Sequence, residues 1–420
     1  MSMLLRLFKR FDTKLLLSIT ALVIFGLFVL YSATFDQFVD ETASLAFLLK
    51  QILAISLGTL LLFGFAYFDY HFLGNYAELI YFFSLALLLI AMNTGQNITG
   101  VARWLYIGPL SFQPSELAKI SLIFILAKYF TKHKGELATL ADIFPALILT
   151  FLPFMLVFKQ PDLGTAFIFL AIFLGLSYWA GAKPLLLFFI LSPLLSIFIL
   201  HIIPVIPWVL WGIYLLLLLY ILHSQKINLF DTAIFWSMNI LAGISSPSIW
   251  NSLKFYQQQR LLSFLNPALD PLAQGTRYHA AKSVIAIGSG KLTGQGFLQG
   301  PLTHLHYIPE HHTDFIFTVI GEEFGLLGTL LILGLFGYIL FRGIQIAVNA
   351  QDGFGSLLAA GIVTFFAFQI VLNIGMTIGL FPVAGIPLPF LSAGGSSFII
   401  SLISIGILES IVIHRKKLFF

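Results

Sequence analysis

Long apolar runs, separated by short polar segments, make up most of the chain. A run of roughly 20 apolar residues is long enough to cross a bilayer as a helix. Such runs predict helices at residues 15–33, 45–67, 76–92, 116–131, 142–158, 164–181, 185–203, 206–222, 229–245, 313–342, 356–380 and 388–413. The pattern predicts an all-α fold, a polytopic transmembrane helix bundle of about twelve spans that forms one integral-membrane domain over residues 1–420.

The composition agrees with a membrane protein. Hydrophobic residues make up 59% of the chain, charged residues only 10%, and the mean hydropathy is +0.98. A soluble domain carries about 25% charged residues. Lys and Arg outnumber Asp and Glu by only 22 to 18, which gives no indication of nucleic-acid binding. The chain contains no cysteine, so thiol nucleophiles and Cys-ligated metals are excluded.

Basic residues recur at alternate ends of the predicted helices. Arg6, Lys9 and Arg10 precede the first helix, and no small-residue cleavage site follows it, so we expect an uncleaved first span. Further basic residues lie at the ends of the fourth, sixth, eighth, tenth and twelfth helices, namely Lys128, Lys183, Lys226, Arg342 and Lys417. By the positive-inside rule, both termini are expected in the cytoplasm.

The longest stretch without a predicted span, residues 246–312, then falls on the outer side. A loop of this length in a compact membrane protein is usually functional. It retains apolar runs such as SVIAIGSG, so we expect amphipathic or short re-entrant helices on the membrane surface. It also contains Asp270, and from spacing alone an Asp-Pro pair is ordinarily a turn former.

Two other polar segments fall on the outer side. In RWLYIGPLSFQPSELAKI (103–120), Arg103 and Trp104 precede the pair Glu116 and Lys119 at the start of a helix. These two charges, three residues apart, either neutralise each other or mark a functional site, because charges entering a membrane are costly. In KQPDLGTA (159–166), Asp162 either caps the next helix or belongs to the same site.

The segment PEHHTDF, residues 309–315, concentrates titratable groups before a long apolar run. Thr313 and Asp314 fit the cap and first turn of the next helix, with His312 beside them. No H-x-x-x-H spacing supports a zinc site. Glu322 and Glu323 lie farther into the same helix, so at least one of them is expected to line a polar interior.

A last segment, GMTIGLFPVAGIPLPFLSAGGSS (375–397), is rich in Gly and Pro and contains no charged residue. Its composition favours turns and close backbone packing. Backbone amides around Ser396 could also bind an anion such as pyrophosphate.

Taken in order, five segments resemble the SEDS family of bacterial peptidoglycan glycosyltransferases, which includes the RodA-like and FtsW-like enzymes. They are RWLYIGPLSFQPSELAK (103–119), QPDLGTA (160–166), FLNPALDP (264–271), YIPEHHTDFIFTVIGEEFG (307–325) and GMTIGLFPVAGIPLPFLSAGGSS (375–397). The resemblance covers nearly the whole chain. The GIPLPFLS wording looks more like the RodA-type elongation enzymes than the FtsW-type division enzymes.

The resemblance implies a glycan-strand polymerase that uses lipid II at the outer face of the bacterial cytoplasmic membrane, in cell elongation and rod-shape maintenance. Transfer would invert the sugar and release undecaprenyl pyrophosphate, with Asp270 as the catalytic base. Substrate and pyrophosphate contacts would come from Arg103, Trp104, Glu116, Lys119, Asp162, His312, Asp314 and Ser396. A divalent cation (Mg²⁺ or Mn²⁺) would serve the leaving group. A class B penicillin-binding protein, a transpeptidase, is the implied protein partner, beside membrane lipid.

The sequence also departs from the family pattern. Residues 206–245 look like an additional helical hairpin, which we expect to be dispensable for chemistry. Thr276 and Arg277 look inserted, and Ala393 stands where Tyr is usual. A lipid II flippase is the main alternative, since broken helices and buried charges also suit a transporter. A structural scaffold is the third reading, but it leaves the buried charges unexplained.

Overall fold

Helices account for most of the chain that the computed structural model describes, which is residues 11–34, 41–94, 103–107, 110–133, 137, 139–202, 206–266, 270, 275, 278–304 and 312–415. Each predicted helix coincides with one of the long helices. These are α2 (Thr13–Thr34), α3 (Glu41–Tyr67), α5 (Ala77–Thr94), α6 (Pro114–Lys132), α7 (Leu140–Lys159), α8 (Leu163–Trp179), α9 (Pro184–Ile202), α10 (Pro207–Ser224), α11 (Leu229–Ser252), α15 (Ile316–Val348), α16 (Gly353–Thr377) and α17 (Gly395–Arg415). The all-α polytopic prediction is confirmed.

Eight of the described helices are long and apolar enough to cross a membrane, and two shorter helices, α5 and α8, are also apolar. α6 and α11 fall outside both groups. α6 carries Glu116, Lys119, Lys128 and Lys132, and α11 carries Asp231, Asn239 and several serines. Charged and polar side chains, some of them buried, therefore separate these two helices from a purely hydrophobic span.

Three predicted helix boundaries are wrong by six residues or more. The last helix was expected from residue 388, but α17 begins at Gly395. Pro389 lies in the missing part and Pro387 directly before it, and proline disfavours helix both at its own position and at the residue before it. α15 continues to Val348, six residues beyond the predicted end, and Arg342, taken as that end, lies inside the helix and pairs with Asp12. α11 continues to Ser252, seven residues beyond its predicted end.

Shorter elements occupy the connections. α4 (His71–Asn75) follows α3, and the strands β1 (Leu105–Ile107) and β2 (Leu110–Phe112) form an antiparallel hairpin before α6. The predicted outer loop contains α12 (Phe255–Leu265), α13 (Tyr278–Ser289) and α14 (Pro301–His304). Helices in this loop were predicted, whereas the β hairpin was not.

The chain divides into two compact units. Unit 1 contains Met1–Lys132, Ile148–Leu176 and Tyr278–Phe420, and unit 2 contains His133–Leu147 and Ser177–Arg277. This division does not test whether the chain forms one domain, so the single-domain organisation stays a prediction.

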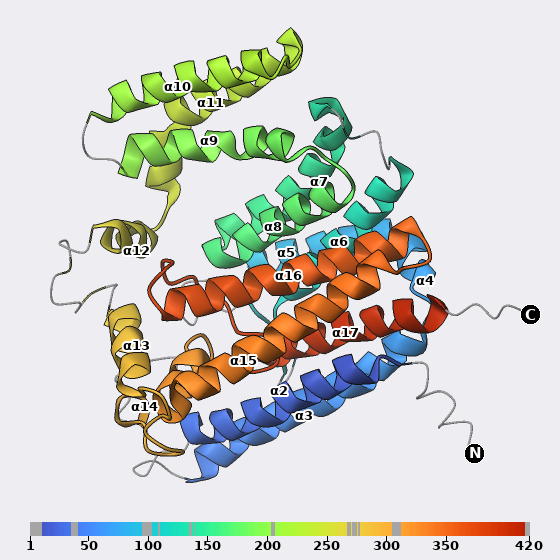
Figure 1. Ribbon diagram of the computed structural model, residues 1–420, viewed down its shortest axis with the longest axis vertical. Coiled ribbons are helices and arrows are strands. Elements are labelled where there is room, and N and C mark those ends of the chain that lie inside the picture. The colour runs from blue at the N-terminus through green and yellow to red at the C-terminus, as the bar shows by residue number, and fades with distance from the viewer. Residues whose placement is uncertain are drawn as a thin grey trace, which may run out of the picture. The chain divides into compact units, whose positions relative to one another are not determined.

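Within unit 1, α16 and α17 are the most buried of the apolar helices, with 72% and 83% of their apolar windows enclosed. α17 lies along α3, α15 packs against α2 and α16, and α6 packs against α5 and α16 (Figure 1). Gly406 of α17 allows close contact with α3, since a Cβ there would lie 2.4 Å from the Leu62 carbonyl oxygen. In lipid no hydrophobic effect drives helices together, so small residues stabilise helix contacts by allowing close packing.

In unit 2, one buried amide joins α9, α10 and α11. The Oδ1 atom of Asn239 accepts hydrogen bonds from Ser196 and Tyr214, both at 3.0 Å. Its Nδ2 atom donates to Ser192 at 2.7 Å and to the Phe235 carbonyl at 2.9 Å. All hydrogen-bonding positions of this amide are used, so the additional hairpin is bonded specifically to α9.

α15 is broken at Gly325, where φ is 63° and ψ is −157°. The segment between α13 and α14 supplies the missing backbone partners. Gln295 and Gly296 donate to the carbonyls of Glu322 and Glu323 at 2.9 and 3.0 Å. In return, Leu326 and Leu327 donate to the carbonyls of Lys291 and Leu292 at 2.9 and 3.1 Å. The broken helix thereby keeps its backbone groups paired.

The carboxylates next to this break are both occupied by structural bonds. Glu322 accepts the backbone N–H groups of Leu302 at 2.8 Å and Thr303 at 3.1 Å, at the start of α14. Glu323 accepts a hydrogen bond from Ser32 of α2. Both side chains are buried, and their bonds fasten α14 and α2 to α15. The expectation that at least one of them lines a polar interior stays a prediction.

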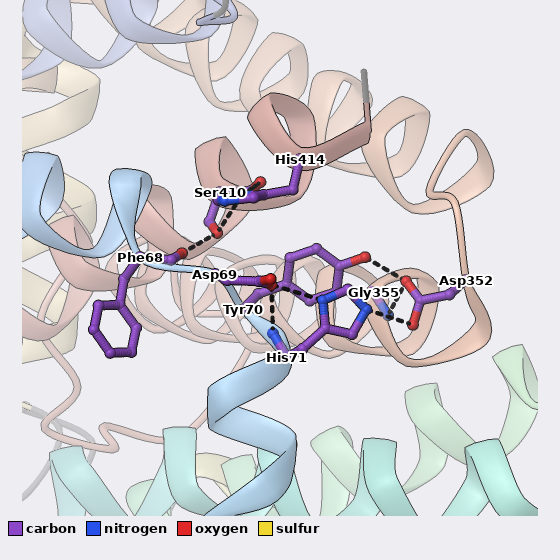
Figure 2. A network of polar contacts seen from close by, with 8 residues as sticks. All are labelled: Phe68, Asp69, Tyr70, His71, Asp352, Gly355, Ser410 and His414. Carbon is purple, nitrogen blue, oxygen red and sulfur yellow. Dashed lines mark hydrogen bonds and ion pairs between the residues drawn. The ribbon is translucent and has the colours of Figure 1, made fainter. Parts of the chain in front are cut away.

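A second polar network lies where α17 ends (Figure 2). Asp69 accepts the backbone N–H of His71 at 3.0 Å and lies 2.6 Å from its Nδ1 atom. The Nε2 atom of His71 is 3.7 Å from Asp352, which also accepts from Tyr70 and caps α16. Ser410 of α17 donates to the Phe68 carbonyl at 2.5 Å. The network ties the ends of α3 and α17 to the start of α16.

Gly294→Ala should destabilise the protein. Gly294 has φ +86°, and a Cβ there would lie 2.0 Å from the Glu323 carbonyl oxygen. We expect a loss of about 1–3 kcal/mol, seen as a lower Tm in detergent. Gly288→Ala on α13 is the matched control, because its Cβ would meet nothing within 4 Å and alanine favours helix. Equal Tm values for the two variants would contradict this account.

Asp69→Asn should remove an acid-dependent part of the stability. Burial acts to raise the pKa of Asp69, but the hydrogen bonds and charge of His71 outweigh it and lower the pKa below 3.8. A lowered folded pKa stabilises above the unfolded pKa and loses that effect as the pH falls through the folded pKa. The Tm difference between wild type and variant should therefore be full at neutral pH and shrink as the pH falls below 3.8 through the lowered pKa of Asp69. A Tm difference that does not change with pH would contradict this prediction.

Candidate functional site

Glu116 and Lys119 form a buried ion pair at the start of α6. The Lys119 Nζ atom lies 2.8 Å from Glu116 Oε1, and the two residues are 1% and 2% exposed. Pro114 at the first helical position fits this start, because its missing N–H would have no helical partner. The predicted mutual neutralisation is therefore present in the structure.

This ion pair retains hydrogen-bonding capacity. The second carboxylate oxygen of Glu116, Oε2, is buried and has no hydrogen-bond partner among the described residues. Lys119 also lies over the ring of Phe365 on α16, 4.9 Å from its centroid. Buried polar atoms are nearly always paired, so the free Oε2 atom indicates a place for a polar ligand or water.

Arg103 bonds to the turn between α7 and α8. Its Nε atom donates to the Gln160 carbonyl at 3.0 Å, and another nitrogen donates to the Pro161 carbonyl. Its Nη1 atom is 3.7 Å from Asp162. The predicted cap role of Asp162 is confirmed, since its Oδ1 atom accepts the Thr165 N–H at 3.2 Å. Arg103 therefore holds the start of α8 in position and also supplies a positive charge.

The β hairpin connects this region to α17. Trp104, next to Arg103, is half-buried at the start of the hairpin. Ser396, in the first turn of α17, accepts the backbone N–H of Gln113 at 3.2 Å and donates to the Ser111 carbonyl at 3.1 Å. The hydroxyl of Ser396 is therefore bonded to protein, and its role toward pyrophosphate stays a prediction.

His312 and Asp314 lie in the turn before α15. The predicted capping by Thr313 and Asp314 is wrong: Phe315 is the N-cap residue and makes no side-chain cap bond. The turn is held by its carbonyl groups instead. Ala393 donates to the His312 carbonyl at 3.0 Å, and Ser392 donates to the Thr313 carbonyl at 2.6 Å. The ring of His312 meets Phe47 edge-on at 5.0 Å.

Asp270 belongs to unit 2, whereas the other eight candidate residues belong to unit 1. Its side chain is half-buried and accepts the Gly275 backbone N–H at 3.1 Å, a bond suited to the turn predicted there. Its catalytic role stays a prediction. Glu310, His311, Thr276 and Arg277 lie outside the described residues.

The described residues contain no group of three or more His, Asp or Glu side chains that could hold a metal ion. Carboxylate oxygens suit Mg²⁺ or Mn²⁺, but the free oxygen of Glu116 adjoins a lysine ammonium group. The described side chains therefore do not by themselves form the expected cation site.

Three amides near these residues were missed from the sequence. Gln160 donates to the Leu88 carbonyl at 3.1 Å, and Gln369 and Asn373 lie fully buried on α16. The sequence did contain a signal for Gln369 and Asn373. They are two amides one turn apart inside an apolar helix, and polar residues in such helices usually have a function.

Comparisons with known proteins agree along the whole chain. Residues 13–417 match the model of the FtsW/RodA/SpoVE family, described as cell cycle protein. The chain is 33% identical to the peptidoglycan glycosyltransferase RodA of Treponema pallidum, covering 96% of this chain and 97% of that protein. It is also 33% identical to the peptidoglycan glycosyltransferase MrdB of Escherichia coli K12, covering 97% and 95%.

A solved structure is also similar. It was described as the structural coordination of polymerization and crosslinking by a peptidoglycan synthase complex. The similarity has a TM-score of 0.72 at 28% identity and covers 97% of this chain and 99% of that one.

Single substitutions of the buried ion pair should cost more stability than the double substitution. Glu116→Gln or Lys119→Met leaves one buried charge unpaired, which costs roughly 3–5 kcal/mol. In the double variant neither charge remains, so its Tm in detergent should exceed that of either single variant. If the losses of the single variants simply add, the two residues do not neutralise each other.

Proposed function

The chain belongs to the FtsW/RodA/SpoVE family of cell cycle proteins, and from that premise we propose that it polymerises glycan strands from lipid II. It is a multi-pass membrane protein and a peptidoglycan glycosyltransferase. We place its reaction at the outer face of the bacterial cytoplasmic membrane, with both termini in the cytoplasm. Its biological role is cell elongation and rod-shape maintenance, and an FtsW-type division role is the alternative.

The proposed reaction is an inverting glycosyl transfer. The 4-hydroxyl of the acceptor sugar attacks the anomeric carbon of the donor, and the bond to undecaprenyl pyrophosphate breaks. Asp270 accepts the hydroxyl proton, and the electron pair of the broken bond leaves with the pyrophosphate. General-base assistance of this kind contributes typically ~10²–10⁴-fold to the rate.

The observation that carries the proposal is the buried pair of Glu116 and Lys119. Its ammonium group is the most enclosed positive charge among the candidates, at 1% exposure. A cation in a dry site stabilises charge on a leaving group far better than a cation in water. The free Oε2 atom of Glu116 supplies an acceptor for a sugar hydroxyl or amide beside it.

Arg103 and Asp162 complete the polar surroundings. Arg103 spans the turn before α8 and lies 28% exposed, so its remaining surface can face a phosphate. Bidentate phosphate contacts are typical of arginine. A bound divalent cation would add positive charge at the leaving group, and no step above depends on it.

The protein partner we propose is a class B penicillin-binding protein, whose transpeptidase crosslinks the new strand. Support comes from the similar solved structure, which was described as a complex that coordinates polymerization and crosslinking. The apolar outer surfaces of the helices are available to a partner helix as well as to membrane lipid.

Asp270→Asn should abolish polymerisation while leaving folding intact. An amide has nearly the shape of a carboxylate but cannot accept the proton, so the rate should fall by ~10²–10⁴-fold. The measurement is glycan length and rate from labelled lipid II, with purified protein in detergent. Asp231→Asn is the matched control, an acidic residue of unit 2 in the first turn of α11, and should retain full activity.

Normal polymerisation by Asp270→Asn would move the base to Glu116, Asp162 or Asp314. If wild-type protein moved lipid II across vesicles without making polymer, the flippase reading would replace the polymerase.

A further inference from the structure

α16 carries two amide side chains in an otherwise apolar environment. Gln369 and Asn373 lie one helical turn apart, and neither is exposed to solvent. Placing an amide in an apolar interior costs free energy unless its hydrogen bonds are made. The partners of these two side chains therefore show what they contribute.

Their amide nitrogens donate to backbone carbonyls of two separate segments. Gln369 Nε2 donates to the Pro387 carbonyl at 2.9 Å. Asn373 Nδ2 donates to the Ile386 carbonyl at 2.6 Å and to the Asp314 carbonyl at 2.8 Å. Asn373 thus bridges the turn before α15 and the irregular segment between α16 and α17.

That irregular segment depends on outside donors. Residues 382–388 have no regular secondary structure, yet Ile386 and Leu388 are each only 1% exposed. Pro387 and Pro389 have no N–H group, and buried carbonyls without donors are costly. Gln369 and Asn373 supply the donors that this backbone lacks.

The bridge sets the position of Asp314. Three successive carbonyls, those of residues 312, 313 and 314, accept hydrogen bonds from Ala393, Ser392 and Asn373. On the other side, a Cβ placed on Gly385 would lie 3.5 Å from the Asp314 carboxylate. Gly385 has φ +66°, a conformation suited to glycine, and the Asp314 carboxylate lies within van der Waals distance of this position.

The remaining amide oxygens argue against a role in packing alone. Gln369 Oε1 and Asn373 Oδ1 are buried and have no hydrogen-bond partner among the described residues. Leaving a buried acceptor unpaired costs stability. An apolar residue would avoid that cost, so what the amides supply is the donated bonds to the two segments.

We propose that Asn373, assisted by Gln369, is a positioning residue of the transferase. Asn373 holds the backbone of Asp314 against residues 385–387 of the irregular segment and so places the Asp314 carboxylate. This inference rests on the proposed function. Asp314 is one of the expected substrate contacts, and misplacing a substrate by about 1 Å costs roughly 10²-fold in rate, so the positioning bond should appear in kcat.

The test is Asn373→Asp, which keeps the side-chain shape and replaces the donor with an acceptor facing two carbonyls. With labelled lipid II, kcat should fall about 10²-fold while KM stays within about twofold. Asn373→Ser, which retains one donor, should recover part of kcat. The matched control is Asn239→Asp, an equally buried amide of α11 that donates two similar bonds. It should lower the Tm and leave the kcat of the folded protein unchanged.

A double-mutant cycle shows whether Asn373 acts through Asp314. If it does, Asn373→Asp should reduce kcat no further in an Asp314→Asn background. Additive losses, or an unchanged kcat in Asn373→Asp, would overturn the inference. If Asn373→Asp does not fold, Gln369→Met serves in the same cycle, because Gln369 donates only one bond to the same segment. Failure of wild-type protein to make glycan would instead refute the proposed function.

Discussion

Inside a membrane, every backbone N–H and C=O must find a partner within the protein, because lipid supplies none. This constraint explains the most irregular parts of the fold. α15 is interrupted at Gly325, and the segment at residues 291–296 replaces the helical hydrogen bonds lost there. The irregular segment before α17 is completed in the same way, by the side chains of Gln369, Asn373 and Ser392. The second of these places brings non-helical backbone next to the candidate site residue Asp314.

The charged groups follow a related rule, since a buried charge needs a partner of opposite sign or several donors. Lys119 has Glu116, Arg342 has Asp12, and Glu322 has two amides of α14. Only some of these charged groups are available for chemistry. The free oxygen of Glu116 distinguishes the pair on α6 from carboxylates such as Glu322, whose oxygens are both bonded.

Hydropathy predicted the long helices well because burial in lipid demands about 20 apolar residues whatever the neighbours are. It failed where a local interaction decided the outcome. The prolines at 387 and 389 delay α17, and the turn before α15 is fixed by carbonyl groups, which carry no sequence signature at Thr313 or Asp314. The family was predicted from its motifs and is confirmed. The pairing of Glu116 with Lys119 followed from their spacing, whereas the bonds of Gln369 and Asn373 depend on segments distant in sequence.

The break at Gly325 also has a consequence for the order of assembly during biosynthesis. The segment that pairs with the break is synthesised before α15, yet its partners exist only when α15 is in place. If α15 enters the bilayer before that segment docks, the carbonyls of Glu322 and Glu323 must keep their own helical partners. On that route α15 inserts as a continuous helix and opens at Gly325 afterwards. The break is then a late step of maturation, in which a membrane helix exchanges its own hydrogen bonds for those of a neighbouring loop.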